Sequence, residues 1–221
     1  MQKASSLTSQ AYSAVREMVL SGEIEPGDKI KIEELRGKLA FGASPLREAL
    51  SLLSSEGLIE RFEQRGFRAA NVSVADFQSL LRTRCWAEER ALREAIEYGD
   101  ASWQEQIVLS EYRLSNADRI AQSDADRRNW ETIHKGFHQA LISACPSAYI
   151  LQFCNQLYDM NVRYRNIASV IAYPGRNVSN EHKRIAEATL DKDADRAVEA
   201  LITHYERTGK YLLKRLSDME A

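Results

Sequence analysis

The sequence predicts a mostly α-helical protein with a small mixed N-terminal domain and a larger, all-helical C-terminal domain. Its 221 residues include only 10 glycines and 4 prolines, so turn-forming residues are scarce. Long stretches are rich in Ala, Leu, Glu, Arg and Gln, which are good helix formers. Short elements give way to long helical patterns near Val72, which predicts domains 1–72 and 73–221.

The N-terminal domain is predicted to begin with three helices. Apolar residues recur at helical spacing over residues 8–20, and a short helix over residues 32–39 follows a Pro-Gly turn. The segment SPLREALSLLSSEG predicts the third helix. Ser44 is expected to be its N-cap, Pro45 suits its first turn, and Gly57 is expected to end it.

A hairpin is expected after the third helix. Residues 58–62 and 67–72 have the pattern of two short strands, and the segment EQRG between them has a glycine at the bend. Helix, helix, turn, helix and then a two-stranded hairpin is the order of a winged helix-turn-helix. The sequence therefore predicts this fold for the N-terminal domain.

Candidate DNA-binding residues lie at the two places where this fold meets DNA. The recognition helix enters the major groove by its N-terminal end, where Ser44 can hold a phosphate and Arg47 can reach a phosphate or a guanine edge. Arg65 and Gly66, at the hairpin tip, suit a wing along a narrow minor groove. The alternative for Arg47 is a surface arginine paired with a neighbouring glutamate.

The net charge of −2 argues weakly against nucleic-acid binding. Residues 1–72 carry ten Lys and Arg and ten Asp and Glu, so the first domain is neutral. The DNA-binding hypothesis therefore depends on where the charges lie. No apolar run is long enough to cross a membrane, and the three cysteines follow no CxxC spacing, so we expect a reduced, cytoplasmic protein.

The segments GEIEPGDKI, SPLREAL, EGLIE and QRGFRAA, in this order, resemble the GntR family of bacterial transcription regulators. The resemblance implies a homodimer, formed through the C-terminal domain, that binds double-stranded operator DNA. The family commonly has an arginine where this chain has Ala43. We therefore expect an unusual operator sequence and a larger contribution from Arg47.

The remaining residues predict a bundle of about six antiparallel helices. The expected helices cover residues 74–98, 101–121, 127–144, 148–167, 178–191 and 194–219. The segments RTRCWAEERALREAI, HKGFHQALISA and SNEHKRIAEATLDKDADRAVEALITHYE resemble the FCD ligand-sensing domain of the FadR subgroup of this family.

The chain has four histidines, and the resemblance places all of them at metal-ligand positions. His134 and His138 are four residues apart and so share one helix face, whereas His182 and His204 lie on two later helices. His134 stands where many relatives have Asp. Four neutral nitrogen ligands favour zinc, with nickel or iron as further possibilities, and they leave the ion's charge available to attract an anion. The alternative is four histidines without a metal.

The resemblance also implies a small carboxylic acid effector that completes the coordination of the ion, with short dicarboxylates such as glutarate as examples. Arg84 and Glu88 match an R-x-x-x-E pattern, and Arg84 is a candidate carboxylate clamp. Arg163 and Tyr164 are further candidates, for which an ordinary structural or solvated role is the alternative.

These features support a transcription regulator, most simply a repressor, whose operator affinity changes when the acid binds. In a second hypothesis the metal ion itself is the signal. A third is a helical metallo-enzyme, because Glu131 and His134 form a Glu-x-x-His pair. Such sites need a second pair of this kind, which the chain lacks, and we therefore expect no enzyme.

Overall fold

The computed structural model describes residues 6–62, 65–117, 123–168 and 175–220. The chain forms two compact units. The first unit comprises Met1–Asp76 with Asp159–Ala168, and the second comprises Phe77–Tyr158 with Ser169–Ala221. The domain boundary after residue 72 stays a prediction.

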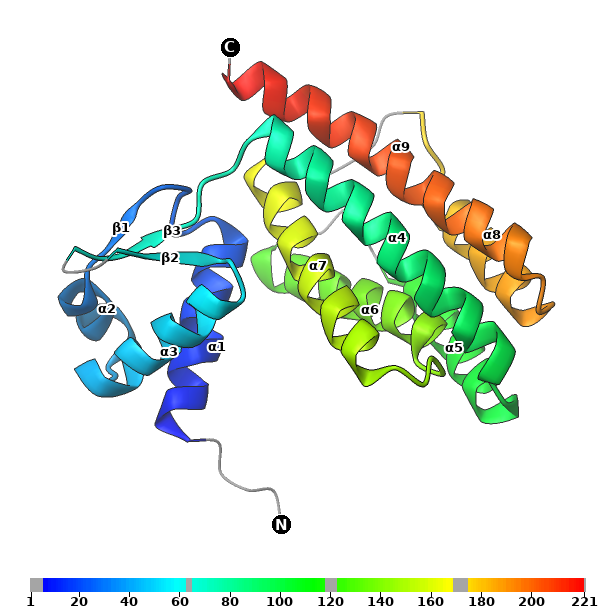
Figure 1. Ribbon diagram of the computed structural model, residues 1–221, viewed down its shortest axis with the longest axis horizontal. Helices are drawn as coiled ribbons and strands as arrows, with labels where there is room; N and C mark the ends of the chain where they lie inside the picture. The colour runs from blue at the N-terminus through cyan, green and yellow to red at the C-terminus, as the bar shows by residue number, and fades with distance from the viewer. Residues whose placement is uncertain (1–5, 63–64, 118–122, 169–174, 221) are drawn as a thin grey trace. The chain divides into compact units, whose positions relative to one another are not determined.

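The first unit has the predicted order of helices and hairpin. Its elements are α1 (Leu7–Ser21), β1 (Lys29–Ile30), α2 (Ile32–Leu39), α3 (Ala43–Ser55), β2 (Ile59–Phe62) and β3 (Gly66–Ala69) (Figure 1). The strands form an antiparallel sheet in the order β1-β3-β2, with Ile30 opposite Phe67 and Ile59 opposite Ala69. The sequence did not predict β1, because two residues are too short to show a strand pattern.

The recognition helix α3 starts two residues earlier than a Ser44 cap implies. Its N-cap is Gly42, whose carbonyl accepts a hydrogen bond from the backbone N–H of Leu46 at 3.3 Å. Ser44 as the N-cap is therefore wrong; it is the second residue of the helix. The predicted end is confirmed, since Gly57 adopts a φ of +76°, which favours glycine, just beyond the last turn.

The core of the first unit holds α1 and α3 together. Their facing apolar side chains are fully buried: Ala11, Val15, Val19, Leu46, Leu50 and Leu53. Full burial of a leucine contributes about 2 kcal/mol, so this seam fixes the angle at which α3 presents its N-terminal end.

The second unit is built from long helices. They are α4 (Val74–Tyr98), α5 (Ala101–Ser115), α6 (Asp124–Ile142), α7 (Ala148–Ile167), α8 (Val178–Leu190) and α9 (Ala194–Glu220), with the start of α4 and the end of α7 in the first unit. The bounds of α4 and α7 are those predicted from the sequence. Helix α5 ends at Ser115, and the predicted extension to residue 121 lies partly outside the described residues. Helix α6 begins earlier than predicted, because the Ser123 side chain caps the backbone N–H of Asp126.

Helices α4 and α9 lie side by side (Figure 1). Gly209 allows this approach, since a Cβ atom there would lie 2.3 Å from Leu81 Cδ2. The fully buried residues of the surrounding core come from five helices: Leu92, Ile107, Phe137, Ile185 and Leu201. In the part of the chain that the structure describes, no helix is both long enough and apolar enough to span a membrane.

Candidate metal centre and DNA-binding surface

All four histidines meet inside the second unit. His134 and His138 come from α6, His182 from α8 and His204 from α9, and each is 2–5 % exposed. One ring nitrogen of each lies within 4.8 Å of the corresponding atoms of the others. Tetrahedral zinc with bonds of about 2.0–2.1 Å separates its nitrogen ligands by roughly 3.4 Å, so the cluster fits a transition metal after small adjustments.

The local sequence explains why the four rings converge. A spacing of four residues puts His134 and His138 on one face of α6. Helices α8 and α9 are joined by a short turn, with His182 eight residues before the last residue of α8 and His204 ten residues after the first residue of α9. Because both helices rise about 1.5 Å per residue, the two histidines lie at nearly the same level, with ring centroids 4.6 Å apart.

A tyrosine and a glutamate fix the tautomer of His134. The Tyr158 hydroxyl donates to Glu131 Oε1 at 2.7 Å and lies 2.7 Å from His134 Nδ1. A carboxylate can only accept, so the tyrosine proton is used on Glu131 and the tyrosine oxygen must accept the Nδ1 proton of His134. His134 Nε2 therefore carries a lone pair.

His138 is held in the same way from another helix pair. The Tyr205 hydroxyl donates to Glu88 Oε2 and lies 3.0 Å from His138 Nδ1, which makes His138 Nε2 the atom with the lone pair. Arg84 balances the charge of Glu88 from 2.6 Å. Burial opposes the charge of Arg84, but Glu88 outweighs it and raises the arginine pKa above its ordinary value.

His204 donates directly to a carboxylate, with 2.8 Å between its Nδ1 and Glu181 Oε2. Arg176 also donates to Glu181. Burial alone would raise the pKa of Glu181, but the hydrogen bonds from His204 and Arg176 hold it well below its ordinary value. A metal-binding histidine usually donates its other N–H to such a partner, so this shell is typical of a metal site.

Two of the converging ring nitrogens face each other at close range. His134 Nε2 and His138 Nε2 are 3.1 Å apart, and both carry lone pairs. His138 is not readily protonated, because burial and the neighbouring imidazoles hold its pKa well below its ordinary value. Burial likewise lowers the pKa of His204 to about 4. The cluster is thus compatible with a metal site of neutral histidines.

The other predicted effector residues fall into two groups. Arg84 and Glu88 are buried one shell outside the histidines, where they support Tyr205 and His138. Arg163 and Tyr164 belong to the first unit, and their side chains donate to the Ala70 carbonyl and to Asp76. These contacts lie within the first unit, and an effector role for Arg163 and Tyr164 stays a prediction.

Sequence reasoning missed most of the supporting shell. Tyr158, Tyr205, Glu181 and Arg176 gave no pattern of their own, although Tyr205 and Glu181 directly adjoin two of the histidines in sequence. Glu131 was noted as part of a Glu-x-x-His pair. It accepts from Tyr158 and lies 3.9 Å from His134 Nδ1, on the side away from the other histidines.

The candidate DNA-binding side chains are all exposed on the first unit. Ser44 and Arg47 lie in the first two turns of α3, and Arg65 and Gly66 lie at the hairpin turn. Among the described residues Arg47 forms no ion pair, and the neighbouring Glu48 instead accepts a hydrogen bond from Thr8 at 2.7 Å. Arg47 is therefore free of the glutamate partner that the alternative assumed.

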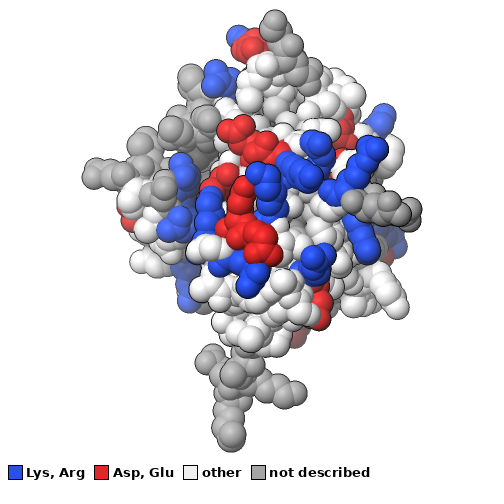
Figure 2. Space-filling model, turned by 90° about the vertical axis from the view of Figure 1, so that its left-hand side faces the viewer, with Lys and Arg blue, Asp and Glu red and all other residues white. Residues whose placement is uncertain are grey.

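Basic and acidic side chains alternate over this unit, as Figure 2 shows. On α2 and nearby loops the cations are paired, Lys31 with Glu34 and Arg36 with Glu33. The neutral total charge of the first 72 residues thus conceals an uneven distribution. The cations at the start of α3 and at the wing stay unpaired within the described residues.

Comparisons with known proteins agree with both units. Residues 7–68 match the family described as "Bacterial regulatory proteins, gntR family", and residues 79–207 match the FCD domain. The uncharacterized HTH-type transcriptional regulator BphR of Paraburkholderia xenovorans (strain LB400) is 36 % identical over 203 residues, covering 91 % of this chain and 83 % of the relative. The HTH-type transcriptional repressor GlaR of Escherichia coli (strain K12) is 28 % identical, covering 87 % and 90 %.

A solved structure shows the same fold at low sequence identity. E. coli McbR/YncC superposes with a TM-score of 0.79 and 18 % identity, covering 96 % of this chain and 99 % of that one. The matched domains and relatives indicate a regulator and not an enzyme. The chain belongs to the GntR family of bacterial transcription regulators, in the FadR-like subgroup that joins a winged helix-turn-helix to an FCD domain, and it is a DNA-binding transcription regulator.

Proposed function

We propose that this regulator is a repressor whose operator affinity is controlled by a small carboxylic acid bound at a metal ion. His134, His138, His182 and His204 would hold the ion, for which zinc is the first choice and nickel or iron are alternatives. The relative GlaR is described as a repressor, which favours repression here.

The observation that carries the proposal is the convergence of four buried imidazoles, each with a ring nitrogen within 4.8 Å of the corresponding atoms of the others. The bound ion would supply a positive centre for an anionic effector. Two of the three carboxylates around the histidines are balanced by arginines, Glu88 by Arg84 and Glu181 by Arg176. The shell therefore does little to cancel the ion's attraction for an acid.

In the proposed function, DNA is bound by α3 and by the wing, the hairpin of β2 and β3. Arg47 would contact a phosphate or a guanine edge, and Ser44, near the helix N-terminus, would hold a phosphate. Arg65 and Gly66 would lie along the minor groove. A homodimer formed through the C-terminal domain would present two such helices to a palindromic operator.

A gel-shift titration of an operator fragment tests the proposal. We expect the acid to change the operator affinity of zinc-loaded protein and to have no effect after the metal is removed with a chelator. The same acid response with and without metal would contradict the coupling of the two ligands.

A second candidate is a regulator for which the metal alone is the signal. The origin of the four histidines favours it, because one ion would join side chains from three helices, α6, α8 and α9. Titrating zinc in the absence of any acid separates the two candidates. A change in operator affinity with zinc alone supports the second.

A further inference from the structure

We infer that the effector is a monocarboxylic acid with an uncharged body no larger than about one six-membered ring, held in a pocket between α6 and α7. This inference rests on the proposed function, since the acid group is taken to face the histidine cluster. It replaces the short dicarboxylates implied by the family resemblance.

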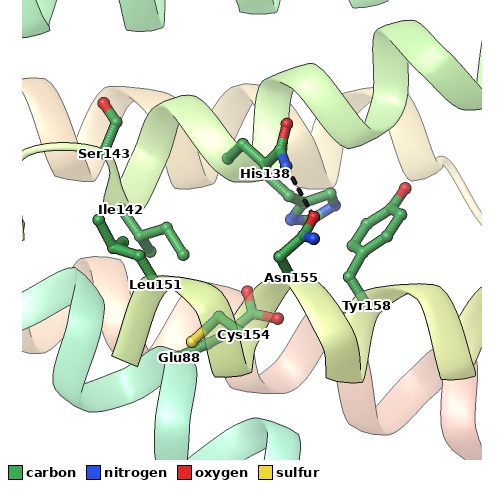
Figure 3. Close-up of a pocket in the computed structure, with 9 residues that line it drawn as sticks. Glu88, His138, Ile142, Ser143, Leu151, Cys154, Asn155 and Tyr158 are labelled. Carbon is green, nitrogen blue, oxygen red and sulfur yellow. Dashed lines mark hydrogen bonds between the residues drawn. The ribbon is translucent and has the colours of Figure 1, made fainter. Parts of the chain in front are cut away.

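The pocket reaches one member of the histidine cluster, His138, and extends away from it. Its volume is about 190 Å³. Its lining residues come from α4, α6 and α7: Glu88, His138, Gln139, Ile142, Ser143, Leu151, Cys154, Asn155 and Tyr158. In Figure 3, His138 and Tyr158 lie at one end and Ile142, Ser143 and Leu151 at the other. A ligand whose acid group approaches His138 therefore directs its body toward Ile142 and Leu151.

The charges around the pocket select against a second carboxylate. Among the described residues that line it, none is a lysine or an arginine, and the only carboxylate is Glu88. Arg84 does not line this pocket. Its Nε pairs with Glu88 at 2.6 Å, and its buried Nη2, which has no hydrogen-bond partner among the described residues, lies outside the lining. A second carboxylate would lose its water and gain no cation, which is strongly unfavourable.

The far part of the pocket suits an apolar body. Cys154 is 1 % exposed and Ile142 is 5 % exposed, and Leu151 completes this part. The Cys154 thiol is uncharged, because burial raises its pKa to about 12. An apolar cavity of roughly 150 Å³ is known to hold benzene, so a ring or a short alkyl chain fits the available volume.

Two neutral amides cross the pocket between the helices. Gln139 Nε2 on α6 donates to Asn155 Oδ1 on α7 at 2.9 Å, as the dashed line in Figure 3 shows. These groups offer hydrogen bonds but no charge. They could hydrogen-bond to a hydroxyl or carbonyl substituent on the ligand, but they would not neutralise the negative charge of a carboxylate.

Calorimetric titration of the zinc-loaded full chain tests the inference with two acids of equal chain length, pentanoate and glutarate. We expect pentanoate to bind at least roughly tenfold more tightly, because only glutarate places a charge at the apolar end. The variant Leu151→Lys adds a cation there and should reverse the preference. The control Leu151→Met keeps the apolar surface and should leave the ratio as in the wild type.

The outcomes separate this inference from the proposed function. Metal-dependent binding of glutarate as tight as that of pentanoate would overturn the monocarboxylate inference and leave a carboxylate-responsive metal site standing. Binding that is equally strong without zinc would overturn the proposed function. Failure of pentanoate, benzoate and glutarate alike to bind the zinc-loaded protein would overturn both.

Discussion

The histidine cluster and the recognition surface place polar groups in opposite environments. The four histidines are at most 5 % exposed, whereas Ser44, Arg47 and Arg65 are exposed to solvent. Polar side chains surround the cluster: Tyr158 lies at hydrogen-bond distance from His134, Tyr205 from His138, and Glu181 from His204. Arg47 has no ion-pair partner among the described residues.

The difference follows from the cost of removing charges and polar groups from water. A side chain that waits for DNA stays hydrated until the phosphate arrives, because burying it unpaired is unfavourable. A site for an ion or a small molecule can be buried only when its polar atoms have partners built into the fold. Substitutions in the buried environment should therefore have larger effects than matched substitutions of exposed side chains.

The largest effect is expected from the buried ion pair behind the histidines. Glu88→Gln keeps the size of the side chain but leaves Arg84 buried without a counter-charge, which should cost roughly 3 kcal/mol of unfolding free energy. All three tryptophans, at positions 86, 103 and 130, belong to the second unit, so their fluorescence during urea unfolding in a chelator reports on that unit.

Glu89→Gln is the matched control on the same helix. Glu89 pairs with Arg93 at 3.1 Å, but both side chains are over a third exposed. Loss of this exposed ion pair should lower the unfolding free energy by less than about 0.5 kcal/mol. Equal effects of the two variants would show that burial does not distinguish these pairs.

On the exposed side, Arg47→Ala should weaken operator binding by about 1–3 kcal/mol with the fold intact, because one contact to a base edge or phosphate is lost. A gel-shift titration measures the affinity, and circular dichroism checks the helix content. Arg90→Ala, which removes an exposed arginine from the second unit, is the charge-matched control. Unchanged affinity of Arg47→Ala would contradict the assigned docking of α3.

Tyr205→Phe should lower metal affinity by about 10–100-fold, because it removes the oxygen that fixes the His138 tautomer while leaving the ring in place. Competition with a chromophoric zinc chelator measures the affinity. Tyr149→Phe, at a side chain that is 87 % exposed, should leave it unchanged. A normal affinity for Tyr205→Phe would show that this hydroxyl does not prepare the site.

The smallest effect concerns the wing. Gly66 has a φ of +87° with open space around it, so Gly66→Ala should destabilise the hairpin by roughly 1 kcal/mol through backbone strain alone. Gly37→Ala, within α2 and equally unobstructed, should instead stabilise its unit by about 0.5–1 kcal/mol. Hydrogen exchange of the first unit measures the change in stability for both variants. Changes of the same sign would contradict the role given to the positive φ of Gly66.

The sequence was sufficient for elements with strong periodic patterns and distinct ends. The bounds of α4 and α7 were predicted to the residue, and Gly57 was correctly expected to end α3. The N-cap of α3 was misplaced, since Ser44 is a better capping residue than Gly42 by type but not by backbone position. Strand β1 has only two residues and could not be recognised without its partner β3.

The four histidines were found because they are few and the family resemblance gave them positions. The supporting shell could not be predicted in the same way. Tyr158, Tyr205 and Arg176 become hydrogen-bond partners of the histidines only through packing between helices that are distant in sequence. The carboxylate clamp predicted for Arg84 illustrates the same limit. Its Nε donates to Glu88 and its guanidinium lies 3.9 Å from the centre of the Tyr205 ring, contacts that the sequence pattern alone could not show.

The metal content of the purified full chain tests the central claim most directly. After zinc loading and dialysis, elemental analysis should find about one zinc per chain in the wild type and less than about a tenth of that in His182→Ala, with operator binding retained by the variant. Equal zinc in the two proteins, or none in the wild type, would contradict a metal site built from these four histidines.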